Sequence, residues 1–278
     1  MSLFWEALEM LPKLPMGCNT TWSLVGSRSV VRTEANSNTG TAILAQAGIW
    51  ILATLVWASV FMAPEFTFVC YHPVSSLSIL CLRRSRPQPQ FEASKHARSM
   101  STIIQLILSQ LVNSAGILLL TQAILVLQPT HTAKQKVTGT HVHFVLNLVG
   151  VMALISGLII MEMNKAHHPE TRFTHVHGVM GLITYILIFL QALIGFSQFY
   201  VPNQVFGSVE KGKAIYKYHR MSGYVILVMA LATICAATQT PFNTSVLHIK
   251  LWAVIVAGIL VLVGVIPRIK KSKMGWGP

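Results

Sequence analysis

The chain has 278 residues, of which 53% are hydrophobic and only 10% are charged. This composition excludes an ordinary soluble domain and is typical of a polytopic membrane protein. The net charge of +13 would suggest nucleic-acid binding in a soluble protein, but here the cations gather between apolar runs, where they indicate loops retained in the cytoplasm.

Six apolar runs are long enough to span a bilayer, which takes about 20 helical residues. They follow a tail, 1–42, that lacks a signal-peptide pattern and is expected to be disordered. The predicted fold is all-α, a polytopic membrane bundle of six transmembrane helices. The spans are expected at 43–63, 103–127, 142–163, 176–200, 217–237 and 247–267.

The basic C-terminal sequence PRIKKSK predicts that the C-terminus is cytoplasmic, with 271–278 as a tail. With six spans the N-terminus is then cytoplasmic too, as are the expected loops 128–141 and 201–217. The basic segment 83–100 falls on the outer side and is the one strong exception to the charge rule. Four scattered cysteines without C-x-x-C or zinc spacing predict neither a disulfide framework nor thiol chemistry.

Three histidines, His143, His177 and His219, stand near the starts of apolar spans. Ionisable residues at membrane depth are costly and often functional. Gly181 and Gly223 follow two of them at the i, i+4 spacing, on the same helix face, which would leave room for a flat macrocycle. Interfacial histidines and close helix contacts through small residues are the alternatives.

Charge and topology arrange the histidines in depth. The third and fifth spans both start on the inner side, so His143 and His219 should lie at one level. His177 starts a span on the outer side, and His72 before the second span is its candidate partner. Two facing imidazoles suffice to ligate a haem, whereas a zinc site would need more ligands from these antiparallel helices.

The sequence resembles the cytochrome b561 family, and the short six-helix fungal-type members in particular. The resemblance extends from about 43 to 270, apart from 74–110, which has no counterpart. The segments that carry it are YHP (71–73), LLLTQAILVLQPTH (118–131), HFVLN (143–147), HVHG (175–178), ITYILIFLQALIGFSQF (183–199) and YKYHRMSG (216–223).

This resemblance implies an oxidoreductase with two b-type haems that passes electrons from cytosolic ascorbate to an outer acceptor, monodehydroascorbate or a ferric chelate. Carried over by position, His143 and His219 hold the inner haem, and His72 and His177 the outer one. The protein is expected to lie in a lipid bilayer, and the sequence does not distinguish an endomembrane or vacuolar membrane from the plasma membrane. A homodimer is an open alternative to a monomer. Nucleic acid is not an expected partner.

Residues 74–110 interrupt one otherwise continuous helix. If they are deleted, FVCYHP joins LVNSAGILLL, and Asn113 and Gly116 then follow His72 by four and seven positions. Asn147 and Gly150 follow His143 at the same distances, and Gly116 and Gly150 are expected, like Gly181 and Gly223, to leave space for a haem. The interrupting segment opens with Val-Ser, which a splice donor can encode, and ends in Gln, which CAG encodes. We interpret it as a retained intron; a real lumenal loop is the alternative.

Further residues are expected around the haems. Asn147 could fix the ring of His143, and Gln191 and Tyr185 are expected to join helices. An anionic donor would be attracted by the inner cations Lys134, Lys136, Lys217 and Arg220, which equally fit positive-inside anchoring. Two other functions stay open: a haem-bearing anchor that reduces a quinone or partner protein, and a haem-free transporter or scaffold.

Overall fold

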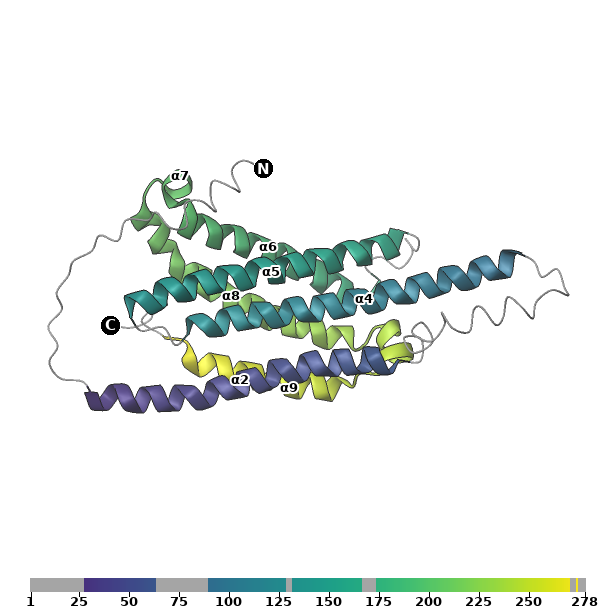
Figure 1. Cartoon of the computed structure of the whole chain (residues 1–278), viewed down its shortest axis with the longest axis horizontal. Helices are drawn as coiled ribbons and strands as arrows, with labels where there is room; N and C mark the ends of the chain where they lie inside the picture. Colours follow the sequence, from purple (N-terminus) through teal and green to yellow (C-terminus); the bar gives the residue numbers. More distant parts are fainter. Residues whose placement is uncertain (1–27, 64–89, 129–131, 167–173, 271–273, 275–278) are drawn as a thin grey trace.

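The structure is a computed structural model that describes residues 28–63, 90–128, 132–166, 174–270 and 274, and not the side chains of 28–39 and 90–101. Its helices run nearly parallel to one long axis (Figure 1). They are α2 (Arg28–Met62), α4 (Gln90–Leu127), α5 (Ala133–Ala166), α6 (Val176–Tyr200), α7 (Pro202–Phe206), α8 (Val209–Ala237) and α9 (Leu251–Val265), with short turns at Asn243–Leu247 and Ile266–Arg268.

Six helices are long and apolar enough to cross a membrane, which confirms the predicted fold class and the six expected spans. They extend over Gly40–Met62, Thr102–Leu127, Ala133–Ala166, Val176–Tyr200, Val209–Ala237 and Leu251–Arg268. Many large apolar side chains on them are exposed, among them Met152, Phe189 and Ile259. An all-helical chain with exposed apolar faces satisfies its backbone internally and offers those faces to lipid.

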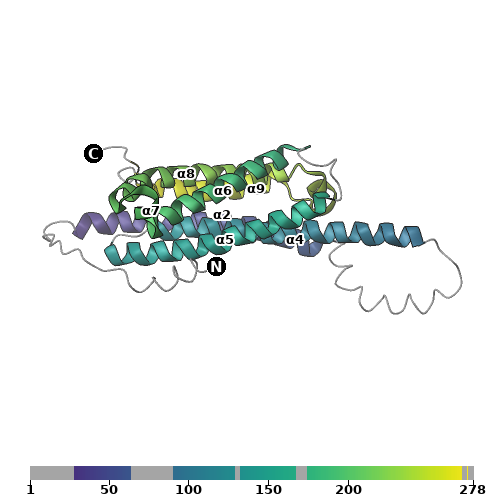
Figure 2. The same ribbon diagram turned by 90° about the horizontal axis from the view of Figure 1, so that it is seen from above.

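The helices pack mainly in three pairs, α4 with α5, α6 with α8, and α2 with α9. In Figures 1 and 2, α2 and α9 lie together along one side of the bundle. A buried apolar cluster joins this pair to α4 and α8, with Ile49, Leu118, Leu227 and Val261 among its members. Gln46 and Gln122 exchange side-chain hydrogen bonds of 2.7 Å, which tie α2 to α4.

Two helices begin earlier than the apolar pattern indicated. The expected loop 128–141 is wrong because α5 starts at Ala133, where Thr132 and Gln135 form a reciprocal capping box. The expected loop 201–217 is likewise mostly helical. Gly207 ends α7 at φ +79, and the Ser208 hydroxyl then accepts the Lys211 N–H at the start of α8.

α4 is longer than a bilayer requires. A helix of 38 residues is about 57 Å long at 1.5 Å per residue, against a hydrocarbon core of about 30 Å. Its first turns project beyond the neighbouring helices in Figures 1 and 2. The expected span 103–127 is confirmed, because Thr102–Leu127 of α4 are long and apolar enough to cross a membrane. α2 also begins before its expected span. It starts at Arg28, inside the tail 1–42 that was expected to be disordered.

Candidate haem-binding site

His143 is held by a neighbouring helix. Its Nδ1 lies 2.8 Å from the carbonyl oxygen of Ala123 on α4. Because a carbonyl oxygen can only accept, this contact places the proton on Nδ1 and leaves the lone pair on Nε2. A fixed tautomer with a free Nε2 is the arrangement that orients an imidazole as a metal ligand.

His219 reaches the same level of the bundle from α8. Its ring packs against Gly195 of α6, where an added Cβ would lie 2.8 Å from the ring Cε1. The imidazoles of His143 and His219 are close enough to interact electrostatically. The structure therefore brings this predicted pair together, at what we call the His143 end of the bundle.

His177 stands at the opposite end, which we call the His177 end. Its Nδ1 lies 3.0 Å from the carbonyl oxygen of Thr233 on α8, so this ring is held in the same manner as that of His143. The hydroxyls of Thr184 and Thr233 lie 3.1 Å apart beside it. The groups of the described residues in electrostatic range of His177 are Lys165 and His175, and neither is an imidazole from a facing helix.

The predicted partner of His177, His72, lies outside the described residues. On α4, the position four residues before Asn113, which the joined sequence would give to His72, is occupied by Ser109. Ser109 is fully buried, and its hydroxyl donates to the carbonyl of Leu106. In this chain α4 therefore carries a serine where the shortened sequence would carry a histidine.

The expected haem-space glycines have different surroundings. Gly116 and Gly150 face each other where α4 crosses α5; added Cβ atoms would lie 3.0 and 3.2 Å from the other glycine's carbonyl oxygen. These contacts correct the expectation of open space, since both glycines allow close helix approach. At Gly223 the Gln191 amide lies 3.1 Å from such a Cβ. Gly181 has only an ordinary contact at 3.9 Å.

Two of the three predicted polar residues, Gln191 and Tyr185, act between helices as expected. The prediction for Asn147 is wrong. Asn147 donates to the carbonyl of His143 at 2.7 Å, not to its ring. Gln191 and Tyr185 do join helices. Gln191 donates to the His219 carbonyl at 2.5 Å, and the Tyr185 hydroxyl donates to Asn113 at 2.7 Å.

The predicted cations and two further histidines lie toward the helix ends. Lys134, Lys136, Lys217 and Arg220 are exposed at the His143 end. His175 is the N-cap of α6 and is also exposed. His141 is only partly exposed; it meets Phe199 edge-on at 5.5 Å, in an aromatic cluster between α5 and α6.

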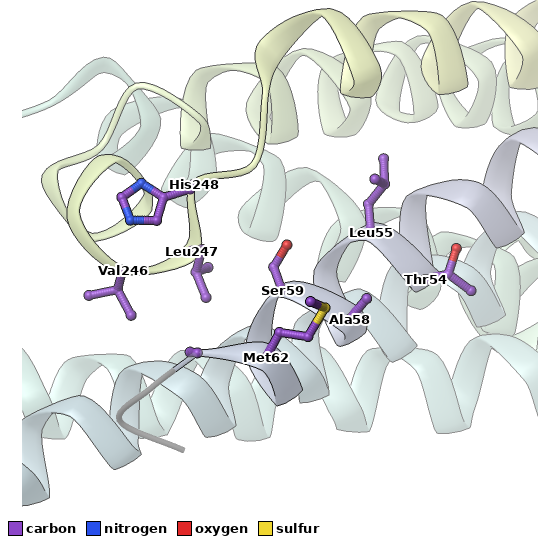
Figure 3. A pocket seen from close by; sticks show the side chains of 9 residues that line it. Thr54, Leu55, Ala58, Ser59, Met62, Val246, Leu247 and His248 are labelled. Carbon is purple, nitrogen blue, oxygen red and sulfur yellow. The ribbon is translucent and has the colours of Figure 1, made fainter. Parts of the chain in front are cut away.

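A pocket of about 480 Å³ lies elsewhere, between the last turns of α2 and the α8–α9 connection. Figure 3 shows Ser59, Met62 and His248 around it. His248 adopts a left-handed backbone conformation at φ 54. Of the predicted haem histidines that the structure describes, His143, His177 and His219, none lines this pocket.

The histidine geometry fits a haem. Two imidazoles on facing helices need no further protein ligand to hold one, and the Nδ1 contact of His143 leaves its Nε2 available. Among the described residues, no group of three or more His, Cys, Asp or Glu side chains could hold a bare metal ion. Fold and site together define a polytopic membrane protein of the haem-binding helix-bundle class.

Comparison with known families agrees with this class. Residues 109–243 match the eukaryotic cytochrome b561 family. This match implies transmembrane electron transfer through haem, with two b-type haems as the usual complement of that family. The match begins beside Gln110, the last residue of the segment expected to lack a counterpart. Neither the curated proteins nor the solved structures that were compared gave a match.

Proposed function

We propose that this protein transfers electrons across a membrane from cytosolic ascorbate to an extracytoplasmic acceptor, monodehydroascorbate or a ferric chelate. His143 and His219 would hold one b-type haem, and His72 and His177 the other. A bound haem would supply a reversible one-electron carrier. The observation that carries the proposal is that His143 of α5 and His219 of α8 lie within electrostatic range of each other, while Nδ1 of His143 is bonded to the Ala123 carbonyl.

Charge supports the direction of transfer. Exposed lysines on the first turns of α5 and α8 lie at the His143 end, and the positive-inside rule favours the cytoplasm for that end. The same cations would raise the local concentration of an anionic reductant such as ascorbate. Arg220 follows a predicted ligand directly, and it is exposed. Both chain termini then belong to the cytoplasm.

The test is a haem-to-polypeptide ratio and an ascorbate-reduced minus oxidised spectrum on the purified chain, followed by transfer in vesicles. We expect a b-type spectrum that ascorbate produces from the side bearing the α5 and α8 lysines. Haem that dithionite reduces but ascorbate does not would indicate the haem-bearing anchor instead. A colourless protein would leave the transporter or scaffold.

A further inference from the structure

Gln198 is a buried polar residue with an unused hydrogen-bond donor. It is 3% exposed in the last turn of α6, and its Nε2 has no hydrogen-bond partner. A buried donor without a partner loses its hydration and gains nothing in return. Most buried side-chain polar atoms are satisfied, so this exception calls for an explanation.

Gln198 lies beside the His143 end of the site. Gln191, Gly195 and Gln198 share one face of α6 by their spacing, and all three meet α8. Gly195 packs against the ring of His219, and the backbone carbonyl of Gln198 accepts a long 3.5 Å hydrogen bond from Tyr216, one turn before His219. Gln198 thus lies about one turn along α6 from Gly195, the residue that meets the His219 ring, on the side toward α7.

The two glutamines on this face differ sharply. Gln191 is satisfied at both ends of its amide, because Nε2 donates to the His219 carbonyl and Oε1 accepts from Ser222 at 2.8 Å. Gln198 lacks such a partner for its Nε2. The Nδ1 of His219 is also buried and unpartnered, unlike the Nδ1 atoms of His143 and His177. Two orphaned nitrogens therefore lie on the same α6–α8 interface.

We propose that the Nε2 amide of Gln198 donates a hydrogen bond to an anionic oxygen bound beside His219. The inference rests on the proposed function. The anionic oxygen would be either a carboxylate of the bound haem or an enolate oxygen of the reductant, because both offer the same acceptor chemistry. An amide suits this position, since a buried neutral donor costs less desolvation than a buried ammonium would. Exposed cations on α8, Lys213 and Lys217 among them, favour an anion nearby.

The test compares Gln198→Met and Gln198→Glu with Ser197→Ala. Met keeps the length of the side chain without a donor, and Glu also adds a charge. Ser197 is the matched control, because its hydroxyl bonds only the Leu193 carbonyl of its own helix, on an exposed face. The measurements are haem content, the midpoint potential in a redox titration, and the ascorbate concentration that gives half-maximal reduction rate.

If the acceptor is a haem carboxylate, the Met variant changes the reduction equilibrium about ten-fold, a shift of about 59 mV for a one-electron couple. If it is the reductant, the half-maximal ascorbate concentration rises about ten-fold at unchanged potential. The Glu variant should change the same quantity further. Gln198→Leu serves as a second apolar variant if Met fails to fold.

The inference is overturned if the Met and Glu variants retain haem, and if their reduction equilibrium and half-maximal ascorbate concentration stay within two-fold of wild type. That result would assign the amide to packing alone. A wild-type chain without b-type haem would remove the proposed function and this inference with it. That outcome is seen before any variant is compared, so the two failures are distinguishable.

Discussion

The two ends of the bundle hold a histidine ring in the same way, but they differ in the groups that surround it. At each end the Nδ1 of a histidine donates a hydrogen bond to a backbone carbonyl of a neighbouring helix, that of Ala123 for His143 and that of Thr233 for His177. At the His143 end a second imidazole, His219, lies within electrostatic range. Around His177 the described residues supply hydroxyls and a lysine instead.

The difference traces to α4. This helix provides the carbonyl that holds His143, but near the His177 end it carries the fully buried Ser109. The helices that carry the other histidines, α5 with His143, α6 with His177 and α8 with His219, are continuous through both ends. A change in α4 near Ser109 would therefore affect the His177 end and leave the His143 end in place, because the two ends use different turns of this helix.

The largest effect is expected from removing an imidazole at the His143 end. His219→Ala deletes one of two ligands, and a single remaining imidazole should not retain a b-type haem through purification. We expect loss of the ascorbate-reducible spectrum, while His177→Ala keeps it. Expression level and thermal stability in detergent serve as the folding controls. Equal loss in both variants would contradict the independence of the two ends.

Deletion of 74–110 should have the opposite effect at the His177 end. It would place His72 four residues before Asn113, the position that Ser109 occupies here. We expect two haems per polypeptide in the shortened chain and one in the full chain. Spliced transcript sequenced through codons 70–115 gives an independent check. A transcript that retains all these codons, with equal haem content in both chains, would instead support a real lumenal loop.

Much of this arrangement could be predicted from sequence, and the remainder depends on contacts between helices. Apolar length predicted all six spans, and span direction predicted the level shared by His143 and His219. The start of α5 was readable too, since Thr132 and Gln135 have capping-box spacing. The bond of His143 to the Ala123 carbonyl and the packing of His219 against Gly195 could not be predicted, because each depends on the register of one helix against another.

The next largest effect is expected from a substitution at Gly195, beside the His219 ring. A methyl group at Gly195 would lie 2.8 Å from Cε1 of His219, whereas one at Gly181 has its nearest contact at 3.9 Å. Overpacking costs about 1–3 kcal/mol, so Gly195→Ala should lower haem affinity at the His143 end by roughly ten- to hundred-fold.

Gly258→Ala of α9, where an added Cβ would meet nothing within 4 Å, is the matched control and should bind haem as the wild type does. The measurement is a haem titration of the apo chain, followed through the absorbance of the bound cofactor. If Gly195→Ala bound haem normally, the ring of His219 could adjust at little cost, and the close contact would not restrict the ligand.

The smallest effect is expected where the two ends are joined. Tyr185 of α6 donates to Asn113 of α4 at 2.7 Å, and the Asn113 amide fills the space over Gly157 of α5. Interhelical hydrogen bonds in membranes contribute about 0.6 kcal/mol on average, so Tyr185→Phe should lower the midpoint of thermal unfolding by about 2 °C.

Gly157→Ala should destabilise the chain more than Tyr185→Phe, because its methyl group would overlap the Asn113 amide. That displacement would also break the bond to Tyr185, so the double variant should cost less than the two separate losses together. Strict additivity in thermal unfolding would show that the Tyr185 and Gly157 contacts of Asn113 are independent. Sub-additive losses with haem content unchanged at the His143 end would show that Asn113 couples α4, α5 and α6 as one unit away from that centre.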